Sequence, residues 1–156
     1  MKLFVEWGRP VRLRDGTRQN LIYVVDLQKL PQVPGVYVLG RRWGAEFEAL
    51  YVGKAFGIRG RVKNQLNNLR LMQHLRNAKS GKRIVIPGKI VTKPGQQLNK
   101  TLLTTERALI RHFLSRGDDL VNKQGTRLRH HEVHSSGKHP KKFIPRIMFL
   151  EKGKRG

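Results

Sequence analysis

A chain of 156 residues fits one domain, and a chain of this length buries roughly two-thirds of its unfolded surface when it folds. The lack of cysteine excludes disulfide scaffolds and thiolate zinc sites and suits a reducing cytoplasm. No apolar run approaches about 18 residues, so no membrane span is expected, and the first residues do not resemble a signal peptide. A formal net charge of +23 destabilises a compact chain unless a polyanion offsets it. Nucleic acid is the polyanion that this charge favours, ahead of a basic surface kept for solubility.

The first half of the chain is predicted to consist of short strands joined by turns. Residues 3–7 and 21–27 are rich in β-branched and aromatic side chains, which is typical of strands. Residues 36–39 and 50–52 predict two more strands. The connection between these two is short enough for them to pair as an antiparallel hairpin.

Helices are predicted from residue 57 onward. Ile58 and Val62 recur at helical spacing after Gly57, and residues 69–75 either extend that helix or form a second one. Near the end of the chain, residues 143–150 form an apolar run that a proline interrupts, which predicts an edge strand.

The strongest helix prediction follows a predicted hairpin. Residues 84–91 contain a Pro-Gly pair between two β-branched stretches, which indicates a small hairpin. Further along, Asn99 or Thr101 can cap the start of a long helix, and Gly117 lies just past its expected end.

Basic residues are concentrated in two segments. Residues 54–100 contain 12 basic and no acidic residues, and residues 126–156 contain 9 basic and 2 acidic residues. We expect a single domain over residues 1–156, with a core over roughly 21–125 and a basic C-terminal extension over 126–156. The cations of the helix after Gly57, of its extension and of the tail are predicted to contact the phosphate backbone of DNA rather than its bases. These candidates are Arg59, Lys63, Arg70, Arg76, Arg127 and Arg129.

One carboxylate interrupts the apolar face of the predicted long helix. Glu106 follows Leu102 by four residues and precedes Ile110 by four, so it shares their face. A buried carboxylate without a partner is costly, and it therefore needs a cation or a metal ion. From the helix alone, a structural pairing with an arginine and a metal-ligand role are both open.

Two tripeptides, Gly35-Val36-Tyr37 and Tyr51-Val52-Gly53, stand near the middle of the chain, and Lys54 follows the second directly. Arg61, Glu106 and Asn122 come after them in that order. Either tripeptide alone is a weak signal, but the ordered set resembles the GIY-YIG nuclease superfamily over residues 34–122. This resemblance implies an α+β fold with a small central mixed or antiparallel sheet, the two motif strands at its centre and helices on its sides. Asn122 would then orient a neighbouring group by hydrogen bonding.

The resemblance implies a role in DNA phosphodiester hydrolysis for each motif residue. Glu106 would hold one divalent ion, Mg²⁺ or Mn²⁺, with waters as its other ligands. Tyr37 is the candidate general base, with its pKa lowered by the metal and a neighbouring cation, and Tyr51 would position the water or the phosphate. Arg61 would clamp phosphate oxygens in a bidentate way, and Lys54 would assist with its charge.

Two features depart from the superfamily pattern. About 45 residues separate Arg61 from Glu106, which predicts an insertion that includes the hairpin at 84–91. Gln65 stands where some restriction members carry a catalytic histidine, so the excision-repair type of site is the better model. A non-cleaving protein that binds DNA or RNA on the same fold, and a sequence-specific restriction-type enzyme, are the alternatives. The intact motif set favours cleavage, because a pure binder gains little from a buried carboxylate.

Overall fold

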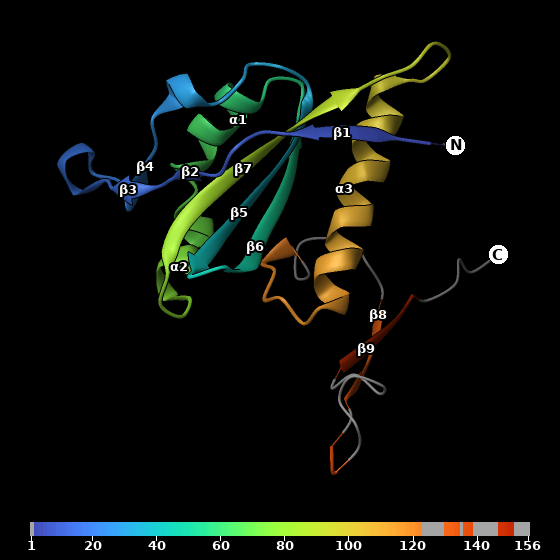
Figure 1. Ribbon diagram of the computed structural model, residues 1–156. Helices are drawn as coiled ribbons and strands as arrows, with labels where there is room; N and C mark the ends of the chain where they lie inside the picture. Colours follow the sequence, from blue (N-terminus) through green and yellow to red (C-terminus); the bar gives the residue numbers. More distant parts are fainter. Residues whose placement is uncertain (1, 123–129, 135, 139–146, 152–156) are drawn as a thin grey trace.

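The computed structural model describes residues 2–122, 130–134, 136–138 and 147–151. This part of the chain is α+β, with an antiparallel central sheet and three α-helices, so the predicted class is confirmed at that level. The helices are α1 Ile58–Gln65, α2 Leu69–Asn77 and α3 Leu98–Ser115. Helices α1 and α2 lie on one side of the sheet and α3 lies on the other (Figure 1).

The central sheet has five strands. Four of them follow the order β1-β7-β5-β6, and the fifth, β2, also pairs with β7. All the pairings in this sheet are antiparallel. Its strands are β1 Phe4–Trp7, β2 Val11–Arg12, β5 Gly35–Trp43, β6 Glu46–Ala55 and β7 Lys82–Val91. Two small sheets pair β3 Arg14–Asp15 with β4 Tyr23–Val24, and β8 His130–His134 with β9 Ile147–Glu151.

The hairpin of β5 and β6 carries the two tripeptide motifs. The predicted strands at 36–39 and 50–52 and their antiparallel pairing are confirmed, and both strands are longer than predicted. The register places Tyr37 opposite Gly53 and Leu39 opposite Tyr51, so both tyrosines point to the same face of the sheet. A register shift after Leu39 leaves Leu50 as the extra residue of a bulge.

Two apolar clusters cover the two faces of this hairpin. On one face, Tyr37 and Leu39 pack with Ile58 and Val62 of α1 and with side chains of α2. On the other face, Val38 and Val52 pack with the α3 residues Ile110 and Leu114. Both faces of β5 are therefore buried, which is why its sequence is an almost continuous apolar run.

The structure separates the two helices whose junction was left open. Helix α1 ends at Gln65 and α2 begins at Leu69, and the Asn68 side chain caps α2 by accepting from the backbone N–H of Leu71 at 3.1 Å. The capping prediction for α3 is wrong. This helix begins at Leu98, and the Thr101 hydroxyl donates to the Gln97 carbonyl at 2.9 Å instead of capping the helix start. Gly117, just past the end of α3, has φ +86°, as a residue in that position often does.

Residues 84–91 are not a hairpin in an insertion but belong to the interior strand β7. Pro87 and Gly88 do not interrupt it, because β7 is paired on both sides. Gly8 donates its backbone N–H to the Pro87 carbonyl at 2.8 Å, so the side of Pro87 that lacks a donor faces the interruption between β1 and β2. As a consequence the second motif strand, β6, lies at an edge and not at the centre of the sheet.

Residues 21–27 form much less strand than predicted. Only Tyr23 and Val24 pair, as β4. The Asp26 carboxylate then accepts from the backbone N–H of Gln28 at 3.1 Å and starts a 3-10 helix at Leu27–Lys29, which ends the extended segment. The strand predicted at 3–7 is confirmed. Of the strand predicted at 143–150, residues 147–150 belong to β9, and residues 143–146 lie outside the described residues.

Candidate functional site

The two motif tyrosines are joined by the side chain of Gln65. The Gln65 amide nitrogen donates to the Tyr37 hydroxyl at 3.0 Å and to the Tyr51 hydroxyl at 3.1 Å. Asn68 donates in turn to the Gln65 amide oxygen at 3.2 Å, which fixes the orientation of that amide. Because each hydroxyl accepts from Gln65, each retains its own proton for another partner. In the sequence, Gln65 stood out only as a departure from the superfamily pattern. Residue spacing does not reveal that a side chain of α1 contacts two strands.

Tyr37 is fully closed from solvent, with 0% of the residue exposed. Burial and the neighbouring Tyr51 raise the pKa of its hydroxyl, and the weaker contributions of Gln65 and Arg61 lower it. The expected lowering of the Tyr37 pKa by nearby cations is therefore outweighed by burial. Tyr51 is only partly buried and is the tyrosine nearer to solvent.

Glu106 is a half-buried carboxylate among cations. Burial raises its pKa, while Lys54, Arg107 and Arg61 lower it. Among the described residues, no hydrogen bond and no ion pair within 4.0 Å involves this carboxylate, so its oxygens are available to a ligand. These residues belong to three different elements: Lys54 to β6, Arg61 to α1 and Glu106 to α3. Lys54 and Arg61 both act electrostatically on Glu106, so the structure brings this part of the predicted site together on the β6 side of the sheet.

The metal prediction depends on this one carboxylate. In the part of the chain that the structure describes, no group of three or more histidine, aspartate and glutamate side chains could hold a metal ion. A single unpaired carboxylate fits Mg²⁺, which keeps several water ligands and needs few from protein. Thiolate or histidine-rich metal sites do not fit these residues.

Asn122 holds the outer edge of β6 through its side-chain amide. Its side-chain oxygen accepts from the Val52 backbone N–H, and its side-chain nitrogen donates to the Val52 carbonyl, both at 2.8 Å. Asp118 accepts from the backbone N–H of Ala49 at 3.0 Å on the same edge. Asn122 thus fixes the residue between Tyr51 and Gly53, and its predicted role at the site stays a prediction.

The predicted phosphate contacts lie on α1 and α2. Lys63 and Arg76 are exposed, and Arg70 is also exposed although it has a further interaction. Arg59 is partly used within the chain, because its Nε donates to the Leu30 carbonyl at 2.9 Å. The remaining two candidates, Arg127 and Arg129, lie outside the described residues.

A cleft of about 620 Å³ adjoins these cations. Lys54 and Arg61 both line it, together with Leu102 and Leu103 of α3, which precede Glu106 by about one helical turn. The cleft therefore lies between the end of β6, the first turns of α1 and the first turns of α3.

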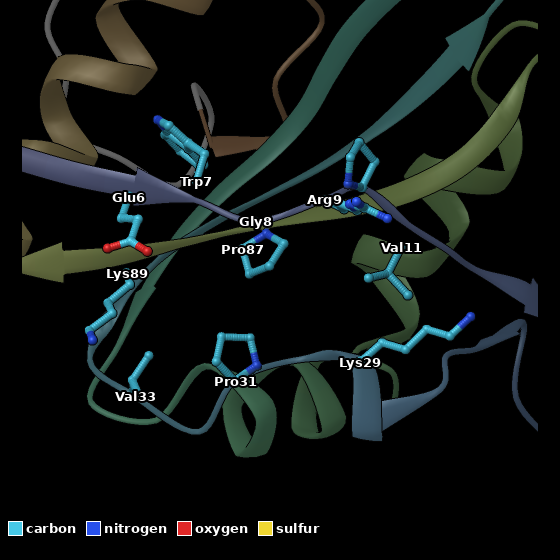
Figure 2. A pocket seen from close by; sticks show the side chains of 11 residues that line it. Glu6, Trp7, Gly8, Arg9, Val11, Lys29, Pro31, Val33, Pro87 and Lys89 are labelled. Atoms are coloured by element: carbon cyan, nitrogen blue, oxygen red, sulfur yellow. The ribbon is translucent and has the colours of Figure 1, made fainter.

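A second cavity, of about 650 Å³, lies at the other edge of the sheet and contains none of the predicted catalytic residues. Pro31, Val33 and Pro87 line it, and Lys89 lies near its rim (Figure 2). The indole of Trp7 points away from this cavity (Figure 2). Trp7 is nevertheless one of the residues that line the cavity.

Comparison of the chain with protein-family models, with curated proteins and with solved structures gives no match. The resemblance to the GIY-YIG nucleases is thus carried by the motif residues and their order in the sequence alone. None of the helices in the described residues has the length and apolar character needed to cross a membrane.

Proposed function

We propose that this chain is a metal-dependent endonuclease that hydrolyses phosphodiester bonds in DNA, on a GIY-YIG-like fold and in the cytoplasm. The observation that carries the proposal is the unpaired Glu106 carboxylate beside Lys54 and Arg61. A carboxylate that serves structure would be expected to pair with one of these cations directly. A site that must hold a metal ion and a phosphate instead keeps its carboxylate available to the metal ion and its cations available to the phosphate.

Glu106 is the residue that would hold the divalent ion, Mg²⁺ or Mn²⁺. When bound, such an ion polarises a phosphoryl oxygen and lowers the pKa of a bound water. The fit is supported by a half-buried carboxylate that is not engaged by the described residues.

The chain's own cations would bind the scissile phosphate. Arg61 presents a planar guanidinium suited to two phosphate oxygens, and Lys54 adds a second positive charge. Both side chains act on Glu106 electrostatically, so a phosphate between them would be close to the carboxylate. Neutralising the charge that develops on the phosphate is the main contribution that we assign to them.

The tyrosines would orient the attacking water. Tyr51 is partly exposed and its hydroxyl retains a proton to donate, so we assign to it the contact with water or phosphate. Tyr37 is closed from solvent and its pKa is raised, so we assign it a positioning role through Gln65. A role for Tyr37 as general base would require the bound metal and Arg61 to overcome the effect of burial.

A cleavage screen tests the proposal and separates the alternatives. Single-stranded, duplex, flap and junction DNA and single-stranded RNA would be incubated with the protein in Mg²⁺ or in EDTA. We expect cleavage of at least one DNA substrate in Mg²⁺ and none in EDTA. Binding without cleavage of any substrate would instead favour the non-cleaving protein. Discrete bands from a long duplex would favour a restriction-type enzyme.

A further inference from the structure

Among the described residues, those that line the cleft beside Lys54 and Arg61 include no acidic side chain. Besides these two cations it is lined by three amide side chains, by apolar residues of α3 and by one aromatic ring. The amides belong to Gln32, Asn64 and Asn99. Ligand clefts combine an apolar wall with a few polar groups that fix orientation, and a volume of about 620 Å³ is within the usual range for them.

The backbone donors at the start of α1 are already used within the chain. The N–H groups of residues 58, 59 and 60 donate to Val33 O, Pro31 O and Gln32 Oε1. An anion in this cleft would therefore be bound by the side chains of Lys54 and Arg61 and not by the helix start. Both cations also act electrostatically on the Glu106 carboxylate.

Among the residues whose exposure the structure describes, Phe56 is the most exposed of the large apolar side chains, at 65%. Cations lie over the rings of Phe4, Trp43 and Phe47, but no cation or ring contact involves Phe56 among the described residues. An uncovered ring at the wall of a cationic cleft is the arrangement that binds unpaired bases by stacking.

The amide side chains suit the edge of a base. An asparagine or glutamine amide offers a donor and an acceptor side by side, which matches the hydrogen-bonding edge of a nucleobase. Gln32 is held in place, because its amide oxygen accepts from Gly60 at 2.9 Å and a Cβ on Gly57 would collide with its side chain. Its amide nitrogen has no hydrogen-bond partner among the described residues.

We propose that this cleft accepts one unpaired nucleotide of the nucleic-acid substrate, with its base stacked on Phe56 and its phosphate bound by Lys54 and Arg61. The position of this nucleotide next to the scissile phosphate rests on the proposed function. The cleft selects single-stranded or splayed segments, because a base inside a duplex cannot reach a concave site of this kind.

A binding cycle in EDTA tests the cleft without cleavage. The probes are a labelled single-stranded DNA oligomer and an oligomer of equal length made of abasic residues, which carries the same phosphates without bases. The variants are Phe56→Ala, Phe56→Trp and the control Phe4→Ala, which changes an exposed ring outside the cleft. Phe56 is exposed, so its removal should leave the fold intact.

Phe56→Ala is expected to weaken binding of the base-bearing oligomer by between about fivefold and about a hundredfold. Its effect on the abasic oligomer should stay within about twofold, as should the effects of Phe4→Ala on both probes. Phe56→Trp should bind the base-bearing oligomer at least as well as wild type. Equal weakening of both probes by Phe56→Ala, or no weakening of either, would overturn the inference.

Cleavage of the base-bearing oligomer in Mg²⁺ separates this inference from the proposed function. If wild type binds in a Phe56-dependent and base-dependent way but cuts nothing, the cleft stands as a nucleotide site and the nuclease proposal fails. If wild type cuts and Phe56→Ala binds like Phe4→Ala, the nuclease proposal stands and the cleft inference fails.

Discussion

Tyr37 and Gly53, one from each tripeptide motif, face each other across β5 and β6, and the Tyr37 ring occupies the space that a side chain on residue 53 would need. A Cβ on Gly53 would overlap the ring and hydroxyl of Tyr37. The glycine of the second motif is therefore required by the tyrosine of the first. The packing of the Tyr37 ring against Gly53 therefore links the two motifs.

Gly53→Ala should destabilise the protein by about 1–3 kcal/mol, because the added methyl forces the Tyr37 ring out of its packed position. Guanidinium unfolding measures the loss. The matched test is the same substitution in a Tyr37→Leu background, where it should cost much less since the ring is gone. An equal cost in both backgrounds would show that the ring does not impose the glycine.

The raised pKa of Tyr37 predicts a specific loss of stability in alkali. A hydroxyl whose pKa is raised by folding keeps the folded state favoured below the unfolded-state pKa of 10.0, and that advantage declines as pH rises above it. Between about pH 9 and pH 12, Tyr37→Phe should therefore lose less unfolding free energy than wild type, by up to about 1.4 kcal/mol for each pH unit above 10. Tyr23→Phe is the control and should follow wild type. A Tyr37→Phe curve parallel to that of wild type would contradict the burial argument.

Replacing either of two buried threonines on α3 with valine should change the stability of the protein, in opposite directions for the two positions. The Thr105 hydroxyl has no hydrogen-bond partner among the described residues, whereas the Thr101 hydroxyl donates to Gln97. Thr105→Val should stabilise the protein by about 1 kcal/mol by removing a buried polar group, and Thr101→Val should destabilise it by about 0.5–1.5 kcal/mol. Thermal or denaturant unfolding measures both, and changes of the same sign would refute the assignment.

Asn122 makes two hydrogen bonds to the backbone of Val52, and we expect β6 to open locally when they are removed. Asn122→Ala leaves the Val52 N–H and carbonyl without those two bonds and should cost about 1–3 kcal/mol. Hydrogen exchange at the Val52 amide should become faster. Asp118→Ala removes the bond to the Ala49 N–H and should leave the Val52 amide protected. Unchanged exchange at Val52 in Asn122→Ala would exclude an edge-holding role.

Local pattern predicted the elements that depend on neighbouring residues. The β-branched run at 36–39 and the spacing of Ile58 and Val62 predicted β5 and α1, because strand and helix periodicity are local. The strand β7 was missed because Pro87-Gly88 is a turn signal locally, and only pairing with β5 and β1 keeps it extended.

The candidate site was predictable in part for the same reason. Glu106 was predicted as a site residue because a carboxylate on an apolar helix face is visible in the sequence, and in the structure Lys54 and Arg61 act on it electrostatically. Gln65 and Phe56 were not identified as site residues. Their contacts depend on how α1 and the end of β6 pack, which residue spacing does not reveal.

The most direct test of the central claim compares DNA cleavage rates in Mg²⁺ for wild type, Glu106→Gln and Glu46→Gln. Glu46 is an exposed carboxylate at the other end of β6 and serves as the control. Burial raises the pKa of Glu106, so its charged form is costly at neutral pH and Glu106→Gln should be at least as stable as wild type. The account predicts that Glu106→Gln slows cleavage at least about a hundredfold while Glu46→Gln cuts like wild type. Cleavage by Glu106→Gln at the wild-type rate would contradict it.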